Sequence, residues 1–482
     1  MAKLKSIIKQ LSENDYKKIY QQLLESNAEK SAQLLRLMYK EQLPDTKIMQ
    51  ELSVNTNAYY TLRSRLNQKI EEYLLEQIES PRTDLLRKVA NIYEIIFTKK
   101  RTIAIATLKK MEKELLDYDL SNELMIVYKT LKKLHINTPE YFEYSQLYNK
   151  HVAYTLAVDK VENLLAEYFQ KYGYYSFTND EQGKLELSLL TKEINYNCKM
   201  YRSHRLYVYQ SCVNVFHRLF VEAETEDQEN EENNEAIEDI FLKVESYFNM
   251  YPLDSTYHHL RIVLEFLRLE YYNYYKLYRK AENYFDIVND SISSLMSSYN
   301  FYIYPARFLL TKLERHLRLN TQHTLSEENE GLFHDFEPDV QNIPQYVTYV
   351  VYRALSFYYA NKYEEASKQI NNLLNSVSLK RFPFVLLEIK VFLAVLYHIR
   401  KEQDLLEQLS HSIQRQIRLL GKEVCTQPLL IMKIIKTASS TSKSERESRI
   451  LGYIDRLKKL STQGFSVCKY LKMDNDLLKR IL

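Results

Sequence analysis

The sequence predicts an all-α fold: an α-solenoid of antiparallel helical hairpins that follows an N-terminal helical domain. Three observations indicate it. The 482 residues include only six glycines, where average usage would give roughly thirty, and glycine supplies the positive backbone angles of tight hairpins and bulges. The nine prolines leave long segments rich in Leu, Lys, Glu and Gln, which favour helices. Apolar residues recur at helical spacing in nearly every segment, and no segment alternates with a period of two.

Residues 1–80 are predicted to form the N-terminal helical domain. Helices are expected at Ala32–Lys40, at Asp45–Leu52 after Pro44, and from Asn57 onward. This pattern resembles the helix-turn-helix of the recognition region of sigma factors, which implies nucleic-acid contacts from the exposed face of the third helix. The residues on or near that face would be Tyr59, Tyr60, Arg63, Arg65 and Lys69. The alternative is a structural helix bundle that caps the solenoid.

Helical stripes continue along the rest of the chain. They are predicted at Leu85–Leu116, Glu123–Leu134, Tyr141–Tyr172, Leu185–Val221, Ile237–Met250, Thr256–Tyr275, Arg279–Ser298, Pro305–Leu319, Tyr346–Ala360, Tyr363–Leu374, Val385–Arg400, Leu405–Leu420 and Arg446–Leu460. Most joins between them are short, which makes neighbouring helices antiparallel. The predicted domains are therefore hairpins at 81–221, 240–319 and 346–436, an acidic loop at 222–239, an inserted loop at 320–345, and a linker with C-terminal helices at 437–482.

The stretch Val350–Leu374 carries the clearest repeat unit. The small residue Ala354 precedes the aromatic Phe357 by three positions, and a turn leads to a second helix. Small residues let two helices approach closely, and aromatic rings fill the groove beside them. The remaining positions of this unit are Tyr363, Ala366 and Ile370.

Two other stretches follow the same spacing. Residues 268–285 place Tyr272, Tyr278, Ala281 and Phe285 at the corresponding positions, and Ala394 with Tyr397 repeats the small–aromatic pair. The pattern resembles the tetratricopeptide repeat over Tyr251–Leu420, although Leu269 and Arg353 depart from it. The resemblance implies that the alanines lie at close helix contacts and that Phe357, Tyr272 and Phe285 are largely buried. Tyrosines at this spacing fill the core and the grooves, or some line a concave binding surface.

Charge is unevenly distributed along the chain. The formal net charge is +3, and basic residues are in excess in residues 1–110 and 429–482. The block 222–239 is strongly acidic, which is typical of a solvated loop, or of a segment that meets a basic partner.

The four cysteines form no C-x-x-C pair, and no apolar stretch is long enough for a signal peptide or a membrane span. We therefore expect a soluble cytoplasmic protein with reduced thiols and no membrane partner.

The chain lacks the sequence motifs of phosphate, metal and nucleophile sites. We therefore expect no enzyme activity, no cofactor and no metal. The first hypothesis is a protein-interaction scaffold that binds a protein or peptide through its helical-repeat surface. The second is a nucleic-acid-binding regulator, in which the helix-turn-helix contacts DNA and the repeats act as a sensor.

Overall fold

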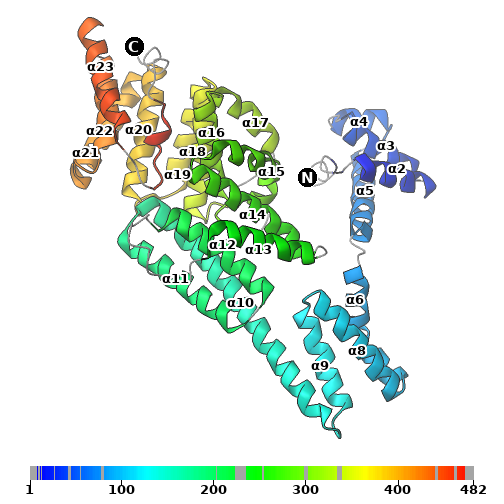
Figure 1. Ribbon diagram of the computed structural model, residues 1–482. Helices are drawn as coiled ribbons and strands as arrows, with labels where there is room; N and C mark the ends of the chain where they lie inside the picture. The colour runs from blue at the N-terminus through cyan, green and yellow to red at the C-terminus, as the bar shows by residue number, and fades with distance from the viewer. Residues whose placement is uncertain are drawn as a thin grey trace. The chain divides into compact units, whose positions relative to one another are not determined.

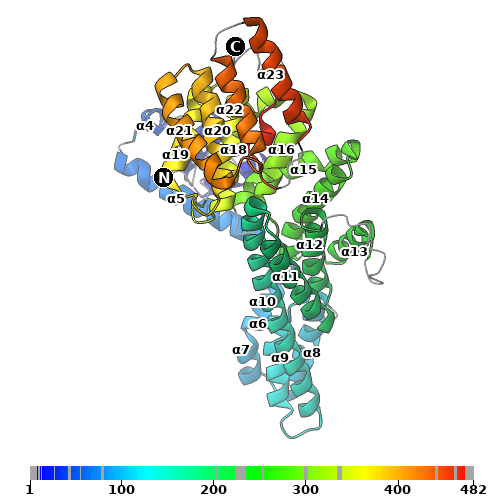
Figure 2. The same cartoon turned by 90° about the vertical axis from the view of Figure 1, so that its left-hand side faces the viewer.

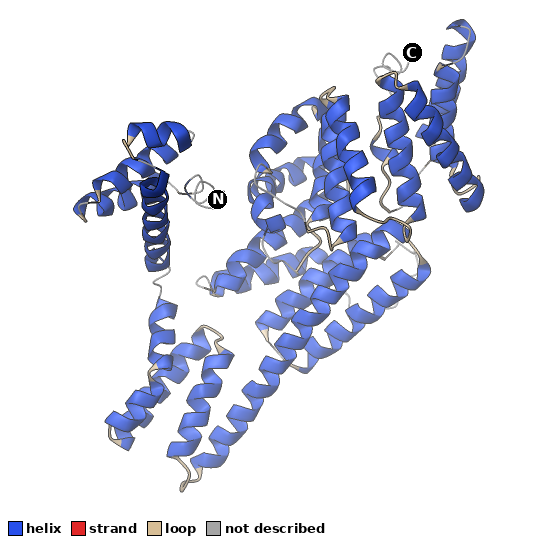
Figure 3. Ribbon diagram, turned by 180° about the vertical axis from the view of Figure 1, so that it is seen from behind, coloured by secondary structure: helices blue, strands red, loops and turns tan. Residues whose placement is uncertain are grey.

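The computed structural model is helical throughout the part of the chain that it describes, and no strand occurs there (Figures 1 and 3). The described residues are 8, 11, 13–26, 28–41, 45–54, 56–77, 81–201, 203–222, 235–251, 254–297, 302–333, 339–439, 443–460 and 464–472. The chain divides into two compact units, Met1–Thr155 and Leu156–Leu482. Among the described helices, none is both long and apolar enough to cross a membrane. The finer domain division expected from the sequence stays a prediction.

The first unit begins with four helices around one apolar core. They are α2 (Glu13–Glu25), α3 (Glu29–Tyr39), α4 (Asp45–Glu51) and α5 (Thr56–Gln77). The bounds of α3 and α4 lie within three residues of those that the sequence predicts, and α5 starts one residue before the predicted Asn57. The core is made of side chains that are almost fully buried, such as Ile19, Leu35, Ile48 and Leu66. Ser53, between α4 and α5, has a φ of 49° and forms the turn of the predicted helix-turn-helix.

The rest of the first unit has a second core. It is built by α6 (Pro81–Ala90), α7 (Ile92–Thr98), α8 (Arg101–Asp117) and α9 (Ser121–Leu134). The sequence predicted one stripe from Leu85 to Leu116, and this is wrong because the helix is broken at Asn91 and again at Lys99 and Lys100. Both breaks let the chain turn, so that Leu85, Leu108 and Leu131 can meet in the same core.

In the second unit, long helices precede the repeat-like hairpins. They are α10 (Glu140–Thr178), which begins in the first unit, α11 (Glu181–Met200), α12 (His204–Phe220) and α13 (Ile237–Met250). The stripe predicted from Leu185 to Val221 is two helices, because Ser203 caps a new helix by accepting hydrogen bonds from the N–H groups of Arg205 and Leu206. Most of the predicted acidic loop lies outside the described residues.

Four helical hairpins follow. They pair α14 (Ser255–Tyr274) with α15 (Tyr278–Ser297), α18 (Ile343–Tyr359) with α19 (Tyr363–Ser376), α20 (Pro383–Ile399) with α21 (Gln403–Leu420), and α22 (Thr426–Ala438) with α23 (Lys443–Lys458). Figure 2 shows α20 to α23 side by side. The linker expected at the start of 437–482 is short, since α22 ends at Ala438 and α23 begins at Lys443.

Three of these hairpins share one turn geometry. A non-glycine residue with positive φ ends each first helix: Lys276 at 57°, Asn361 at 62° and Lys401 at 60°. The next N–H donates to the carbonyl oxygen five residues earlier in each case, at 2.8, 2.9 and 3.0 Å. This is the left-handed helix ending that usually takes glycine. Asp119 makes the same turn between α8 and α9 in the first unit, with a φ of 52°. The glycine deficit therefore does not prevent these tight turns.

The loop predicted at residues 320–345 is wrong in part, because it contains helical segments. Between α16 (Ala306–Leu319) and α18 lie the 3-10 helix η2 (Gln322–Thr324) and the helix α17 (Leu325–Leu332). Leu325 and Asn329 are fully buried, so this segment contributes to the core. The sequence reading missed it because eight residues are too few to display a helical period among so many polar side chains.

The segment 464–472, which includes η3 (Cys468–Tyr470), crosses several helices as a strap. The N–H of Phe465 donates a hydrogen bond to the carbonyl oxygen of Ser176 on α10. The N–H of Val467 and the hydroxyl of Ser466 donate to the carboxylate of Glu388 on α20. The hydroxyl of Tyr470 donates to Glu314 on α16, and the N–H of Lys472 donates to the hydroxyl of Tyr359 on α18. The strap thus ties together four helices that are far apart in sequence.

Candidate functional site

The five residues predicted to contact nucleic acid do not share one exposed face of α5. Tyr59 is 1 % exposed and belongs to the apolar core of α2–α5. Arg63 is also buried, and its guanidinium carbon lies 5.8 Å from the centre of the Tyr59 ring. The expectation that these two side chains are exposed is wrong, because positions 59, 63, 66 and 70 form the stripe of the helix that faces the core.

Two of the five residues are exposed. Arg65 and Lys69 lie four positions apart on α5, so they occupy one side of the helix. The side chain of Tyr60 lies outside the described part of the structure. The basic surface available on this helix is therefore smaller than the sequence indicated.

The residues assigned to repeat packing fall into two groups. Those at the helix contacts are buried, namely Ala281, Phe285, Ala354, Ala366, Ile370, Ala394 and Tyr397. The others are partly or well exposed, namely Phe357, Tyr272, Tyr363 and Tyr278. Phe357 and Tyr272, which were expected to be largely buried, are intermediate: each ring is partly exposed. These rings lie at the margin of their hairpins, where Arg353 covers Phe357 and Tyr284 stacks on Tyr272 at 5.6 Å.

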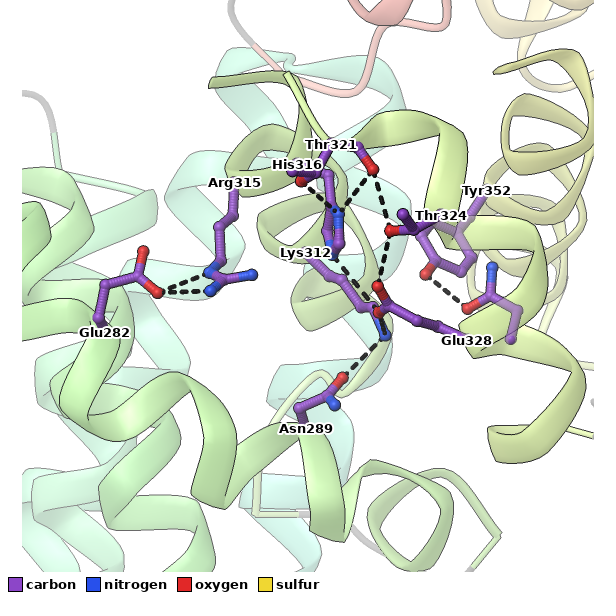
Figure 4. A network of polar contacts seen from close by, with 10 residues as sticks. Glu282, Asn289, Lys312, Arg315, His316, Thr321, Thr324, Glu328 and Tyr352 are labelled. Atoms are coloured by element: carbon purple, nitrogen blue, oxygen red, sulfur yellow. Dashed lines mark hydrogen bonds and ion pairs between the residues drawn. The ribbon is translucent and has the colours of Figure 1, made fainter. Parts of the chain in front are cut away.

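A buried lysine lies at the centre of a polar network between α15, α16 and α17 (Figure 4). The ammonium nitrogen of Lys312 donates to Asn289 at 2.9 Å and pairs with Glu328 at 3.0 Å, although the lysine is 0 % exposed. Burial lowers the pKa of Lys312, and Glu328 opposes this effect. His316 lies 3.5 Å from the same carboxylate, and the hydroxyl of Thr324 donates to it at 2.9 Å. Lys312 and Glu328 both have hydrogen-bond partners, whereas Nε2 of His316 makes no hydrogen bond within the described residues, and the network joins α17 to α15 and α16.

A second buried charge pair joins α14 to α16. The carboxylate of Glu270 is 2 % exposed, lies 3.6 Å from Nε of Arg307, and accepts a hydrogen bond from the hydroxyl of Thr311. Burial raises the pKa of Glu270 to about 7, against the opposing charge of Arg307. The nearby carboxylate of Glu314 also raises this pKa, while Arg307 and Thr311 hold the carboxyl group between α14 and α16, which fits a structural role.

Ser188, His217 and Glu222 lie close together, as the serine, histidine and acid of a catalytic triad do. Ser188 Oγ lies 3.4 Å from Nε2 of His217, but Glu222 lies near the same nitrogen, at 3.6 Å. In a catalytic triad the acid binds the histidine nitrogen that does not face the serine. In this protein that nitrogen, Nδ1 of His217, instead contacts the hydroxyl of Tyr168 at 2.9 Å. Burial also lowers the pKa of His217 to about 4. Among the described residues, no group of three or more metal-ligating side chains converges.

An open groove of about 700 Å³ lies between α21 and α22. Gly421, with a φ of 97°, ends α21, and a short turn leads into α22. The helix α22 packs against α20 and α23. Side chains of both α21 and α22 line the groove. We call it the α21–α22 groove.

The floor of the α21–α22 groove is apolar and its rim is basic. The floor side chains are Leu406 and Ile417 on α21, and Leu429, Met432 and Ile435 on α22. The rim carries four exposed cations: Arg418, Lys422, Lys433 and Lys436. Among the residues that line the groove, one is a carboxylate, Glu407, which is exposed. An apolar floor with a charged rim is the usual composition of a surface that binds another protein.

The sequence reading did not find this groove. It recognised the helix α21 but predicted no helix at Thr426–Ala438, and the position of α22 depends on its packing against α20, which no local pattern reveals. The excess of basic residues in 429–482 was the one signal that pointed to this region. Comparisons with protein families, curated proteins and solved structures find no match to the chain. The class that fold and site define is thus an all-α protein of paired helices with an open interhelical groove.

Proposed function

We propose that this chain is a non-enzymatic protein-interaction scaffold that binds a protein or peptide partner through its helical hairpins. The observation that carries the proposal is the α21–α22 groove, which combines an apolar floor with an exposed basic rim. Leu429 and Met432 on the floor are partly exposed, so a partner that covers them removes apolar surface from water.

The architecture proposed for the scaffold is an α-solenoid of tetratricopeptide-like hairpins. The shared turn at Lys276, Asn361 and Lys401 supports it, because three hairpins then leave their first helix with the same local geometry. Buried alanines at the corresponding positions Ala281 and Ala366 support it as well. Such arrays present their grooves to ligands that are extended or helical.

Site-specific photo-crosslinking in living cells tests the proposal. A photoreactive residue at Gln414, which lines the groove, should capture a discrete protein partner. The matched control is the same replacement at Gln408, which is exposed on α21 but does not line the groove. A partner captured at position 414 and not at 408 supports the proposal, and equal capture or no capture at both positions contradicts it.

The second hypothesis, a nucleic-acid-binding regulator, is supported by fewer exposed residues than the sequence predicted. The arrangement of α3, α4 and α5 and the exposed pair Arg65 and Lys69 favour it. The burial of Tyr59 and Arg63 removes two of the contacts that it would use. We therefore rank protein binding first.

A further inference from the structure

We infer that the α21–α22 groove binds an acidic amphipathic helix of a partner protein. This inference rests on the proposed function, and it adds the chemical class of the ligand. Three features of the groove argue for it in turn: its length, its apolar floor and the sign of its rim.

The length and shape of the groove fit a helix. On α21 the lining positions run from Gln403 to Arg418 and recur every three or four residues, so they form one face over four turns. At 1.5 Å per residue this face is about 22 Å long. A third helix can lie between two helices that are held apart in this way, with its side chains between theirs.

The floor requires an apolar stripe on the ligand. Leu406, Ile417 and Ile435 are at most 6 % exposed, but Leu429 and Met432 remain partly open. A ligand side chain that covers the last two removes further apolar surface from water, which is worth about 25 cal/mol per Å². Met432 is unbranched and flexible, so it adapts to different apolar partners. A fully polar segment would leave this floor unused.

The rim requires negative charge on either side of that stripe. Cations stand on both walls: Arg418 on α21, Lys422 just after it, and Lys433 and Lys436 on α22. With the single carboxylate of Glu407, the lining groups carry a net charge of +3 (four cations minus one anion, with His411 neutral). Carboxylates on the flanks of a bound helix would face these cations, whereas a basic helix would be repelled.

Fluorescence anisotropy of the full chain with a defined probe tests the inference. The probe is a labelled helical peptide of about 16 residues, with leucines at positions i, i+3, i+4 and i+7 and glutamates on the flanks. We expect saturable binding that weakens as salt increases. Three control peptides should bind at least tenfold more weakly: a scrambled version, a version with lysine for glutamate, and the acidic but non-amphipathic stretch 222–239.

Variants of the full chain locate the binding site. Lys433→Glu with Lys436→Glu reverses two rim charges and should weaken probe binding at least tenfold. The matched control is Lys458→Glu with Lys459→Glu, which reverses two exposed charges near the end of α23 that do not line the groove. This control should bind like the wild type. Circular dichroism melts of both variants must match the wild type before the affinities are compared.

Each result has a definite reading. Binding that the rim variant loses and the control variant keeps supports the inference. Absence of probe binding, or tighter binding of the lysine peptide, overturns it. If the probe does not bind while Gln414 still captures a partner in cells, the ligand class is wrong but the scaffold function stands. If both experiments fail, the proposed function fails as well.

Discussion

The backbone N–H of Lys362 donates to the carbonyl oxygen of Phe357 at 2.9 Å, and Asn361, just before Lys362, has a φ of 62°. The same relationship joins Glu402 to Tyr397 across Lys401. A left-handed conformation costs an ordinary residue roughly 1–2 kcal/mol, and asparagine tolerates it better than lysine. The turns are therefore strained to different degrees.

Replacement of Lys401 by glycine should stabilise the protein. The gain should be roughly 0.5–1 kcal/mol, because relief of the left-handed strain exceeds the added entropy of the unfolded chain. Asn361→Gly should have a smaller effect. Thermal melts of the two variants check this, and Lys368→Gly, in the exposed interior of α19, should lose about 1 kcal/mol as a control. Equal losses at positions 401 and 368 would contradict the argument.

Replacement of Ala366 by leucine should destabilise the α18–α19 hairpin. Ala366 is 0 % exposed, so three added carbon atoms must displace neighbouring side chains. The expected cost is roughly 1–3 kcal/mol. Urea denaturation measures it, with Glu365→Leu on the exposed side of the same helix as the control. A wild-type midpoint for Ala366→Leu would show that the assigned repeat register is wrong.

Glu270 should make stability depend on pH. Its pKa is about 7 in the folded protein, above the ordinary value near 4.3 of an unfolded chain. The unfolded chain therefore releases the proton first, and the contribution of Glu270 to stability is largest below pH 4.3 and is lost as pH rises to about 7. The loss amounts to roughly 4 kcal/mol.

Glu270→Gln mimics the protonated acid and should remove this dependence. The stability of the variant relative to the wild type should therefore increase between pH 5 and pH 7.5, as measured by urea midpoints at both values. A difference that stays constant with pH would mean that the carboxyl group ionises normally.

Removal of the carboxylate of Glu328 should destabilise the contact of α17 with α16. The change Glu328→Gln leaves the ammonium group of the fully buried Lys312 without its counter-charge. Loss of one partner of a buried pair costs roughly 3–5 kcal/mol, and we expect roughly 1–3 kcal/mol because Glu328 is 38 % exposed. Lys312→Met in the same background should recover most of the loss, and thermal melts of the single and double variants test this.

The exposed pair Arg65 and Lys69 should not support sequence-specific DNA binding. If DNA did bind there, affinity would fall with salt at a log–log slope of about −0.9 per phosphate neutralised. Titration of the full chain against a library of genomic fragments at two salt concentrations is the measurement. Enrichment of one sequence that an Arg65→Ala, Lys69→Ala double variant loses would reverse our ranking of the two functions.

Most helices were predictable from the sequence, but α17, α22 and the tertiary placement of the helices were not. Strong local periodicity predicted the start of α19 at Tyr363 and the elements α3, α4 and α5. The same periodicity failed at Asn91 and Ser203, where a turn of one to three residues interrupts an apolar stripe without a proline or glycine. Tyr59 was misplaced because the sequence alone does not tell which positions of α5 face the core, and only its packing against α2, α3 and α4 decides this. The groove depends on packing between hairpins, which local patterns do not encode.

The strap at residues 464–472 bears on how the chain folds during its synthesis. It contacts α10, α16, α18 and α20 through groups such as Ser176, Glu388 and Tyr359. Those helices leave the ribosome well before the strap does. Until it emerges, the carboxylate of Glu388 has no backbone N–H from Val467 to bind. The second unit should therefore reach its final packing only late in translation, and a nascent chain stalled before residue 464 should remain accessible to chaperones.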